Sequence, residues 1–473
     1  MDLTELPVNI AIIGGGFCGI VTAVHLLRHN KTGIHLHIIN KGPAFGKGVA
    51  YDPHTCSLLL NVPNGRMSAF ADKPDDFIDW LNANYPNQDN SPTTFSTRRQ
   101  YGEYLLETWN EALNNIPLCN SVTVYDDLAD NITEIDDVLQ IHLRQHPAII
   151  ADAVILATGN AKPRVPNGIH PSFTKSKHYF ADPWKSPCIT NTTDSDVLII
   201  GNGLTTADTI IGLVENGYQQ TIHSVSPHGY RLNPWVDDKA PYTAYSFSGL
   251  PSERISLYQL LKTFNKHRRI ANNSGQSIYP LIDSLRPHIQ RIWLHFTTRE
   301  KQQFIRHLKP YWEKVRHRLP VDMHQKIDVL RKSGLFQPCK GSIISVKELN
   351  GVCEVVLNCS GELKTIRVSR IINCTGPDPD ITRQGNALLN NLVQKETIIQ
   401  GPCGMGINAD HKTGRVIAAG NFHKTNLYVI GSNLKGVLWE STAVPELRVQ
   451  AQNIAEVIIN GIEVRRRHVV ETA

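Results

Sequence analysis

The feature that most constrains this chain is a strand–glycine–helix pattern near its start. The letters VNIAIIGGGFCGIVTAVHLL give an apolar stretch, glycines in the spacing Gly-x-Gly-x-x-Gly, and then an amphipathic segment. Gly14 permits a tight turn, Gly16 lets a pyrophosphate approach the backbone, and Gly19 lets a helix pack closely on the strand. The N–H groups that are free at the helix N-terminus attract phosphate. The pattern therefore predicts a dinucleotide-binding βαβ unit, with a tight turn that holds no ligand as the alternative.

The residue expected to bind the ribose departs from the usual pattern. An Asp or Glu is expected about 20 residues past the motif, but Asn40 stands 21 residues after Gly19, at the end of a predicted strand over residues 36–39. An Asn amide can hydrogen-bond a ribose hydroxyl, but it lacks the charge that strengthens such a bond. We therefore expect the nucleotide still to bind, with an amide in place of the usual carboxylate at the ribose. We also expect that no carboxylate at this position repels a 2′-phosphate.

The same design recurs near the middle of the chain, in SDVLIIGNGLTTADTIIGLVENG. Gly201 and Gly203 join an apolar stretch to a helix, and Thr206 takes the place of the third glycine, which permits a wider helix–strand spacing. No acid ends the next strand, TIHSVS; His228 and Arg231 follow it, which favours NADPH over NADH. A structural βα repeat without a ligand is the alternative for this second loop.

Two glycine loops predict two nucleotides, or one nucleotide and a relic. In the usual arrangement the first unit holds a flavin and the second docks a nicotinamide, and these cofactors carry the redox chemistry. Two further strand ends, Ala157-Thr158-Gly159 and Cys374-Thr375-Gly376, flank the second loop in the sequence. In two-nucleotide flavoproteins such strand ends mark where the chain passes between the two domains.

Four blocks of sequence resemble a known family. They are GKGVAYDPHTCSLLLNVPNGRMSAFADKPDDFIDWL (46–81), RRQYGEYL (98–105), HLKPYWEKVRHRLP (307–320) and GVLWESTAVPELRVQA (436–451). They resemble bacterial FAD/NAD(P)-binding proteins of the NAD-binding-9 type over nearly the whole chain. More distantly, the layout is similar to flavin-containing monooxygenases and to N-hydroxylating monooxygenases. The resemblance implies an α/β fold with two Rossmann-like dinucleotide-binding domains, in which the NAD(P) domain and a helical insertion interrupt the FAD domain.

The predicted domain boundaries follow from this layout. They are 1–190 for the first part of the FAD domain, 191–253 for the first part of the NAD(P) domain, 254–335 for a helical insertion, 336–376 for the return of the NAD(P) domain, and 377–473 for the C-terminal part of the FAD domain.

The resemblance and the motifs together name candidate site residues. The C-terminal block is expected to close over the flavin, with a helix N-terminus near Ala443–Pro445 that stabilises negative charge on the reduced flavin. The candidate cofactor-binding residues are Gly14, Gly16, Phe17, Cys18, Gly19, Asn40, Lys41, Ala157, Thr158, Gly159, Gly201, Gly203, Leu204, Thr205, Thr206, His228, Arg231, Thr375, Gly376, Gly431, Trp439 and Ala443. Arg66, His178 and Trp439 are weak catalytic candidates, and His178 belongs to an incomplete Phe-x-Gly-x-x-x-His signature of the monooxygenases.

The predicted insertion, residues 254–335, is strongly basic. It has 17 Lys and Arg against 5 Asp and Glu, whereas the whole chain has a net charge of only +5. A solvated helical cover with snorkelling basic side chains is one interpretation. A cap in which Arg316, His317 and Arg318 hold an anionic substrate or phosphate is the second, and RNA binding from charge alone is the third.

Three functions are compatible with these patterns. The first is a flavin oxidoreductase that takes hydride from NADPH or NADH and acts as a monooxygenase on a small, anionic or amine-bearing substrate. The second is a flavin dehydrogenase or reductase without oxygen transfer, and the third is a non-catalytic nucleotide-binding protein. Substrate identity and oligomeric state are left open by the sequence.

Other classes are disfavoured by composition. The nine cysteines show no Cys-x-x-Cys and no metal-ligand spacing, so we expect reduced thiols and no metal site. The N-terminus, MDLTELP, is acidic and lacks the features of a signal peptide, and no apolar run reaches the roughly 20 residues of a membrane span. We therefore expect a cytoplasmic protein with no nucleic-acid or membrane partner.

Overall fold

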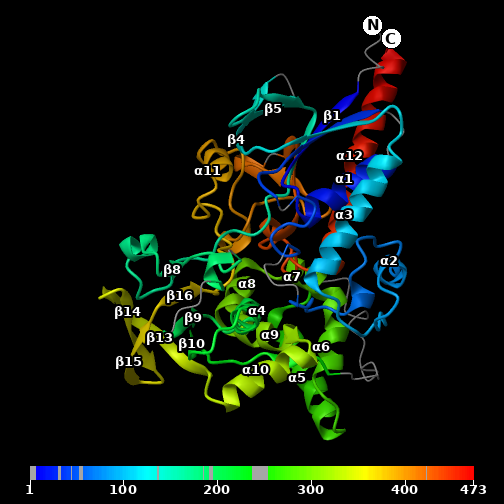
Figure 1. Cartoon of the computed structure of the whole chain (residues 1–473). Coiled ribbons are helices and arrows are strands. Elements are labelled where there is room, and N and C mark those ends of the chain that lie inside the picture. Colours follow the sequence, from blue (N-terminus) through cyan, green and yellow to red (C-terminus); the bar gives the residue numbers. More distant parts are fainter. Residues whose placement is uncertain are drawn as a thin grey trace. The chain divides into compact units, whose positions relative to one another are not determined.

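The computed structural model describes residues 7–29, 33–43, 45–52, 57–135, 138–184, 186–190, 195–236, 254–421 and 423–472 (Figure 1). Three predictions fall partly outside these residues: the N-terminal segment 1–6, positions 53–56 of the first resemblance block, and positions 237–253 of the NAD(P) domain. The chain forms two compact units. Unit 1 comprises residues 1–52, 62–160 and 379–473, and unit 2 comprises residues 53–61 and 161–378.

Unit 1 is built on a six-stranded sheet in the order β17-β18-β7-β1-β2-β3. The strands are β1 (Val8–Ile13), β2 (Ile34–Ile39), β3 (Ser121–Tyr125), β7 (Ala153–Leu156), β17 (Arg415–Ile417) and β18 (His423–Val429). All neighbours pair in parallel except β17 with β18. The central strands are apolar without alternation because both faces of a parallel sheet are covered. All four residues of β7 are buried, which fits that position.

Helices pack against this sheet and against one another. Helix α1 (Phe17–His29) contacts both α3 (Arg98–Asn114) and α12 (Val444–Thr472), as Figure 1 shows. Unit 1 also contains α2 (Asp76–Asn84) and a small sheet of β4 (Ala129–Ile135), β5 (Val138–Leu143) and β6 (Ile149–Ala151), which α11 (Ala387–Gln394) contacts through β4. This arrangement places the glycine loop between β1 and α1 at the carboxyl end of the sheet, where α/β proteins bind their ligands.

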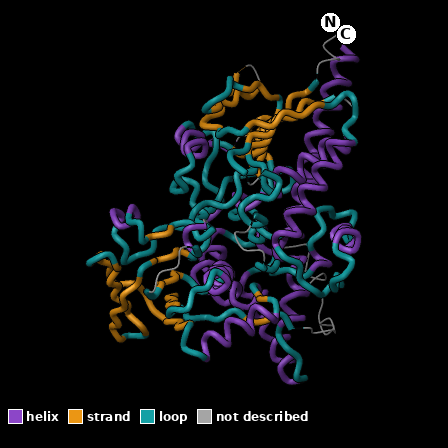
Figure 2. Tube along the Cα trace, viewed as in Figure 1, coloured by secondary structure: helices purple, strands orange, loops and turns teal. Residues whose placement is uncertain are grey.

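Unit 2 is built on a seven-stranded sheet in the order β15-β14-β13-β10-β9-β16-β8. Its strands are β8 (Tyr179–Phe180), β9 (Val197–Ile200), β10 (Ile222–Ser226), β13 (Phe336–Leu349), β14 (Val352–Cys359), β15 (Glu362–Val368) and β16 (Arg370–Asn373). The first residues of β13 pair in parallel with β10, and its later residues pair antiparallel with β14. One strand thus extends the nucleotide-type sheet into the long β13–β14–β15 meander, drawn in orange in Figure 2.

The basic segment 254–335 is helical, as the sequence predicts. It contains α5 (Leu257–Asn273), α6 (Tyr279–Leu285), α7 (Ile289–His295), α8 (Thr298–Gln303), a π-helical turn (Phe304–Leu308), α9 (Lys309–Arg316) and α10 (Val321–Lys332). A two-residue strand, β12 (Arg318–Leu319), pairs with β11 (Asn233–Pro234). Helix α10 packs against α4 (Leu204–Glu215), the helix that follows the second glycine loop. The predicted α/β class with two Rossmann-type sheets and a helical insertion is therefore confirmed.

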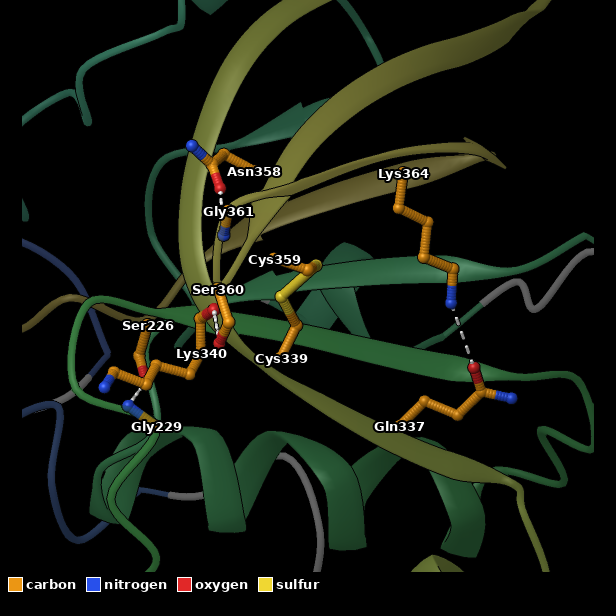
Figure 3. Close-up of a disulfide and its surroundings, with 10 residues drawn as sticks. All are labelled: Ser226, Gly229, Gln337, Cys339, Lys340, Asn358, Cys359, Ser360, Gly361 and Lys364. Carbon is orange, nitrogen blue, oxygen red and sulfur yellow. Dashed lines mark hydrogen bonds between the residues drawn. A yellow bond between two sulfur atoms is a disulfide. The ribbon is translucent and has the colours of Figure 1, made fainter.

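The expectation that every cysteine is a reduced thiol is wrong for one pair. Cys339 in β13 and Cys359 at the end of β14 form a disulfide, with their Cα atoms 5.9 Å apart (Figure 3). The two residues are 20 positions apart, so they do not form a short cysteine motif that the sequence would reveal. They meet because the antiparallel pairing sets Gly341 opposite Cys359. The free cysteines of the described residues are Cys18, Cys119, Cys188, Cys353, Cys374 and Cys403.

Among the residues that the structure describes, no helix is both long enough and apolar enough to cross a membrane.

Candidate nucleotide-binding sites

The first glycine loop can be built only with glycine at two of its positions. Gly14 has a φ of +115°, and a Cβ added to it would lie 2.2 Å from the carbonyl oxygen of Ala157. A Cβ added to Gly19 would lie 1.9 Å from the carbonyl oxygen of Gly14. The loop therefore folds tightly onto the end of β7, and α1 starts directly against β1. This geometry leaves the first turn of α1 available to a phosphate.

Asn40 holds this loop in place. Its Oδ1 accepts a hydrogen bond from the backbone N–H of Gly15 at 3.0 Å, and its Nδ2 lies 3.4 Å from the carbonyl oxygen of Gly42. The residue thus lies at the glycine loop, where the ribose-binding acid of such a unit is expected. The neighbouring candidate, Lys41, is instead engaged at the surface, with its Nζ 3.4 Å from Asp126.

Asp126 is a residue that the sequence pattern did not indicate. It directly follows β3, the strand beside β2, and its Oδ1 accepts from the N–H of Gly42 at 2.9 Å. This hydrogen bond, followed by the charge of Lys41, lowers the pKa of the Asp126 carboxyl. A carboxylate therefore stands next to the position where β2 lacks one, but only the pairing of β2 with β3 reveals it.

The start of the first resemblance block covers the loop. The N–H of Gly46 donates to the carbonyl oxygen of Gly15 at 2.7 Å, and a Cβ added to Gly48 would lie 3.2 Å from the Cα of Gly16. The repeated glycines of this block thus allow two stretches of backbone to pass close to each other beside the expected pyrophosphate position.

The C-terminal block joins the end of β7. The Nδ2 of Asn433 donates to Thr158 Oγ1 at 2.9 Å, and the Oγ of Ser432 donates to the carbonyl oxygen of Gly159 at 2.8 Å. Gly431 has a φ of +85°. Helix α12 begins at Val444, directly after Ala443. The structure thus brings the candidate residues of β7 together with the Gly431 turn.

Two further side chains fix that turn, and the sequence did not indicate them. Gln450 Oε1 accepts from the N–H of Gly431 at 3.2 Å, and Ser441 Oγ donates to its carbonyl oxygen at 2.5 Å. Cys18 also packs here, because a Cβ added to Gly431 would lie 3.1 Å from its Sγ. Burial raises the pKa of the Cys18 thiol to about 12, so it is protonated at neutral pH. The other loop candidate, Phe17, is buried beside Tyr101, with 6.4 Å between ring centroids.

The three catalytic candidates belong to different units, Trp439 and Arg66 to unit 1 and His178 to unit 2. Trp439 is buried in unit 1, with Lys435 Nζ 5.4 Å from its ring centroid, and Arg66 ends a short 3₁₀ turn in the same unit. His178 belongs to unit 2, where its Nδ1 lies 2.7 Å from the carbonyl oxygen of Ser369 and its Nε2 lies 3.5 Å from Glu348. Through these contacts His178 connects its own segment to the segments of Ser369 and Glu348 in unit 2.

The second glycine loop repeats the backbone solution of the first. Gly201 has a φ of +118°, and a Cβ added to it would lie 2.5 Å from the carbonyl oxygen of Cys374. Helix α4 starts after Gly203, with Leu204 and Thr205 in its first turn. Thr206, at the third-glycine position, is buried with 2% of its surface exposed, and the helix accommodates it. Asn202 Nδ2 donates to the carbonyl oxygen of Tyr230 at 2.5 Å, which ties the loop to the segment after β10.

Basic groups collect at the end of β10. Arg231 lines a cavity of about 50 Å³ together with Asn202, Gly203 and Thr206. The His228 ring stacks on Tyr230, with 5.2 Å between centroids and 16° between planes. A further cation, which the sequence did not indicate, is Lys340: its side chain extends over Gly229, as Figure 3 shows.

The strand end Cys374-Thr375-Gly376 is held by the residue before it. Asn373 Oδ1 accepts from the Thr375 N–H at 3.2 Å and from the Thr375 hydroxyl at 2.7 Å. Gly376 has a φ of +85°. The backbone of this strand end makes the close approach: the Cys374 carbonyl lies against Gly201, as the Ala157 carbonyl lies against Gly14.

The three candidates for an anion-binding cap have different surroundings. Arg318 is 3% exposed, lies 3.8 Å from the ring centroid of Trp235 and 4.9 Å from that of Tyr279, and its Nη2 is 2.5 Å from Asp283 Oδ1. Its guanidinium group thus interacts with the Asp283 carboxylate and with two aromatic rings of unit 2. Arg316 is also buried, and His317 is half-buried. In the part of the chain that the structure describes, no three His, Cys, Asp or Glu side chains gather as metal ligands.

The first domain can be compared with a family of known proteins. Residues 11–161 match the FAD-NAD(P)-binding family model NAD_binding_9. The match starts inside β1 and ends just after Gly159, so it spans the first glycine loop, Asn40 and the end of β7. The resemblance that the sequence suggested, and the FAD/NAD(P)-binding character of this domain, are thereby confirmed for residues 11–161, which include the first two of the four blocks. No curated protein sequence matches the chain.

Solved structures match the fold of nearly the whole chain. An ornithine N-hydroxylase from Kutzneria sp. 744, solved with reduced FAD, NADP⁺ and L-ornithine, is 14% identical with a TM-score of 0.62, over 97% of this chain and 100% of that one. The ornithine hydroxylase of Pseudomonas aeruginosa is 13% identical with a TM-score of 0.67, over the same shares. A bacillithiol disulfide reductase from Staphylococcus aureus is 13% identical with a TM-score of 0.57, over 96% of this chain and 99% of that one. This chain therefore has the fold of flavin-dependent oxidoreductases.

Proposed function

We propose that this protein is an FAD-dependent oxidoreductase that takes hydride from NADPH and acts as a monooxygenase on a small amine-bearing substrate. The observation that carries the proposal is the repeated glycine loop. In each unit a glycine with a φ near +115° lies against the carbonyl of a small strand-end residue, Gly14 against Ala157 and Gly201 against Cys374. Both loops open a helix, and an unliganded relic would have no need to keep both solutions.

The residues of unit 1 fit a flavin nucleotide. The first turn of α1 would face the pyrophosphate, and Asn40 would hold the loop and meet the ribose. Thr158, Gly159 and the Gly431 turn would border the isoalloxazine ring. When bound, FAD accepts hydride and, once reduced, reacts with O₂. The N-terminus of α12 would favour the negative charge that reduction places on the ring.

The residues of unit 2 fit NADPH better than NADH. No carboxylate ends β10, and Arg231 and Lys340 supply positive charge beside the second loop. Within the described ranges, the Arg231 guanidinium takes part in no ion pair with a carboxylate. An arginine that binds phosphate through charge-assisted hydrogen bonds contributes about 1.5–3 kcal/mol.

The substrate class follows from the likeness of the folds. It is supported by the whole-chain fold likeness to hydroxylases that act on ornithine, an amine-bearing amino acid. The same fold likeness extends to a disulfide reductase, so a flavin reductase without oxygen transfer is the second candidate.

The test begins with the absorbance spectrum of the purified full-length protein, followed by anaerobic reduction with NADPH and with NADH. Flavin absorbance that NADPH bleaches faster than NADH supports the proposal; a protein that cannot be reconstituted with FAD overturns it. In air, NADPH oxidation is then followed with ornithine, lysine and cadaverine. A hydroxylated amine supports the monooxygenase. Peroxide as the only product with every amine points to the reductase.

A charge variant tests the nicotinamide assignment. Arg231→Gln is expected to raise the KM for NADPH roughly tenfold or more and to leave the KM for NADH nearly unchanged. Arg299→Gln removes an exposed positive charge from α8 and is the matched control. Equal effects of Arg231→Gln on both nucleotides would refute the role of Arg231.

A further inference from the structure

The Cys339–Cys359 disulfide of unit 2 lies where β13 changes partners. Residues up to Lys340 pair in parallel with β10, and residues from Gly341 pair antiparallel with β14. Cys359 is the last residue of β14, directly before the turn to β15. The bond therefore joins the nucleotide-type sheet to the tip of the β14–β15 hairpin (Figure 3).

Both cysteines of the disulfide are partly exposed. Cys339 and Cys359 are half-buried, whereas Cys353, also in β14, is fully buried. Burial raises the pKa of the Cys353 thiol to about 11, which makes it inert at neutral pH. A dissolved reagent is therefore expected to react with the Cys339–Cys359 disulfide and not with the Cys353 thiol.

A cavity of about 350 Å³ opens beside the disulfide. Both cysteines line it, together with Leu357, Gln337 and Lys364. The Nζ of Lys364 lies 3.5 Å from Gln337 Oε1, and Figure 3 shows the two side chains facing each other beside the disulfide. The volume falls in the range of small-molecule sites, with an apolar wall and a few polar groups.

We propose that this cavity is a thiol–disulfide exchange site for a low-molecular-weight thiol that carries a carboxylate. The thiolate of the incoming molecule attacks one protein sulfur, the protein S–S bond breaks, and the other cysteine leaves as a thiolate and takes up a proton. A second small thiol attacks the mixed disulfide and releases the first cysteine. Two small thiols are thereby oxidised to one disulfide, and the protein disulfide is reduced to two thiols.

The lining residues have distinct parts in this exchange. The Lys364 ammonium attracts the carboxylate of the thiol and stabilises a leaving thiolate. His223 also lines the cavity, and its Nε2 lies 3.0 Å from Asp196 Oδ2. That contact orients the ring with Nε2 as donor, which leaves Nδ1 to accept the proton of the incoming thiol. The exchange needs neither flavin nor nicotinamide, so its test is independent of the function proposed above.

The first experiment maps the redox state in the full-length protein. The protein is purified in air, alkylated under native conditions, digested and analysed by mass spectrometry, with and without prior glutathione. We expect a Cys339–Cys359 peptide that glutathione converts to two alkylated thiols while the fold is retained. In Cys359→Ser, glutathione disulfide should add one glutathione to Cys339. Two free thiols in air, or a disulfide that native protein keeps in excess glutathione, would overturn the proposal.

The second experiment tests the charge preference. Reduction rates are measured with glutathione, which carries carboxylates, and with cysteamine, which is cationic, at equal thiolate concentration. We expect glutathione to react several-fold faster, and Lys364→Gln to lower this ratio several-fold. Lys347→Gln removes an exposed lysine of β13 outside the cavity lining and should leave the ratio unchanged. Equal ratios in Lys364→Gln and the wild-type protein would refute selection of an anionic thiol.

Discussion

Replacement of Asn40 measures how much of the flavin grip depends on this one amide. In Asn40→Ala the Gly15 N–H loses its 3.0 Å acceptor, and a hydrogen bond to the ribose is lost with it. A neutral hydrogen bond contributes about 1 kcal/mol net, so two of them amount to about 2 kcal/mol. Water reaches this half-buried position and recovers part of the loss. We therefore expect the Kd for FAD to rise between about 5- and 30-fold.

Asn40→Asp is the informative partner of that variant. It keeps the acceptor for Gly15 and adds the charge that most such units carry, so FAD should bind as tightly as in the wild-type protein or more tightly. The Kd is measured by flavin fluorescence quenching on protein stripped of FAD. Asn115→Ala, which removes an exposed amide bonded to the Glu111 carbonyl at the end of α3, is the control. An unchanged Kd in Asn40→Ala, or loss of binding in Asn40→Asp, would refute the reasoning.

Three further predictions concern stability and reactivity. Burial is the main cause that lowers the pKa of His25 from 6.5 to about 4, so folding favours the neutral imidazole. The stability that this gives is lost as the pH falls below about 6.5. We therefore expect His25 to lower the free energy of unfolding by about 2 kcal/mol between pH 8 and pH 5. Urea unfolding at both pH values measures this loss of stability. We expect it to be absent in His25→Leu and present in His411→Gln, the control at an exposed site. A pH dependence in His25→Leu equal to that of the wild-type protein would contradict the prediction. Cys18, with a pKa of about 12, should be alkylated at neutral pH at least tenfold more slowly than the exposed Cys119, as mass spectrometry would show; equal rates would contradict the raised pKa. Arg318→Leu should lower the free energy of unfolding by about 2 kcal/mol or more without changing the KM for NADPH; a change in that KM alone would instead support a role of Arg318 in binding an anion.

The candidate cofactor sites could be predicted in large part because their requirements are local. A φ of +115° at Gly14 and the close approach of Gly19 to the first turn are demands on single residues, and such demands appear as letters at fixed spacing. The strand ends could also be read from the sequence, but the structure adds a contact that no spacing rule states. The carbonyl of each strand end lies directly against the first glycine of the loop in the same unit, Ala157 against Gly14 and Cys374 against Gly201.

Two of the residues that the sequence missed depend on pairing between distant strands. Asp126 comes beside Asn40 only because β3 lies next to β2, and Lys340 reaches Gly229 only because β13 lies next to β10. Arg318 was a candidate for binding an anion, but its partner Asp283 and its aromatic neighbours are brought to it by the packing of helices. Such contacts join positions that lie tens of residues apart, so no periodicity records them.

The sequence by itself thus determined the class of fold, the two nucleotide loops and the helical character of the basic segment. These properties follow from backbone conformations and from apolar patterns that each segment carries on its own. Only the tertiary structure decided that Cys339 meets Cys359, that a cavity lies beside their bond, and that Lys340 stands near the second loop. The physical reason is that strand register and packing set these distances, and both are properties of the assembled sheet.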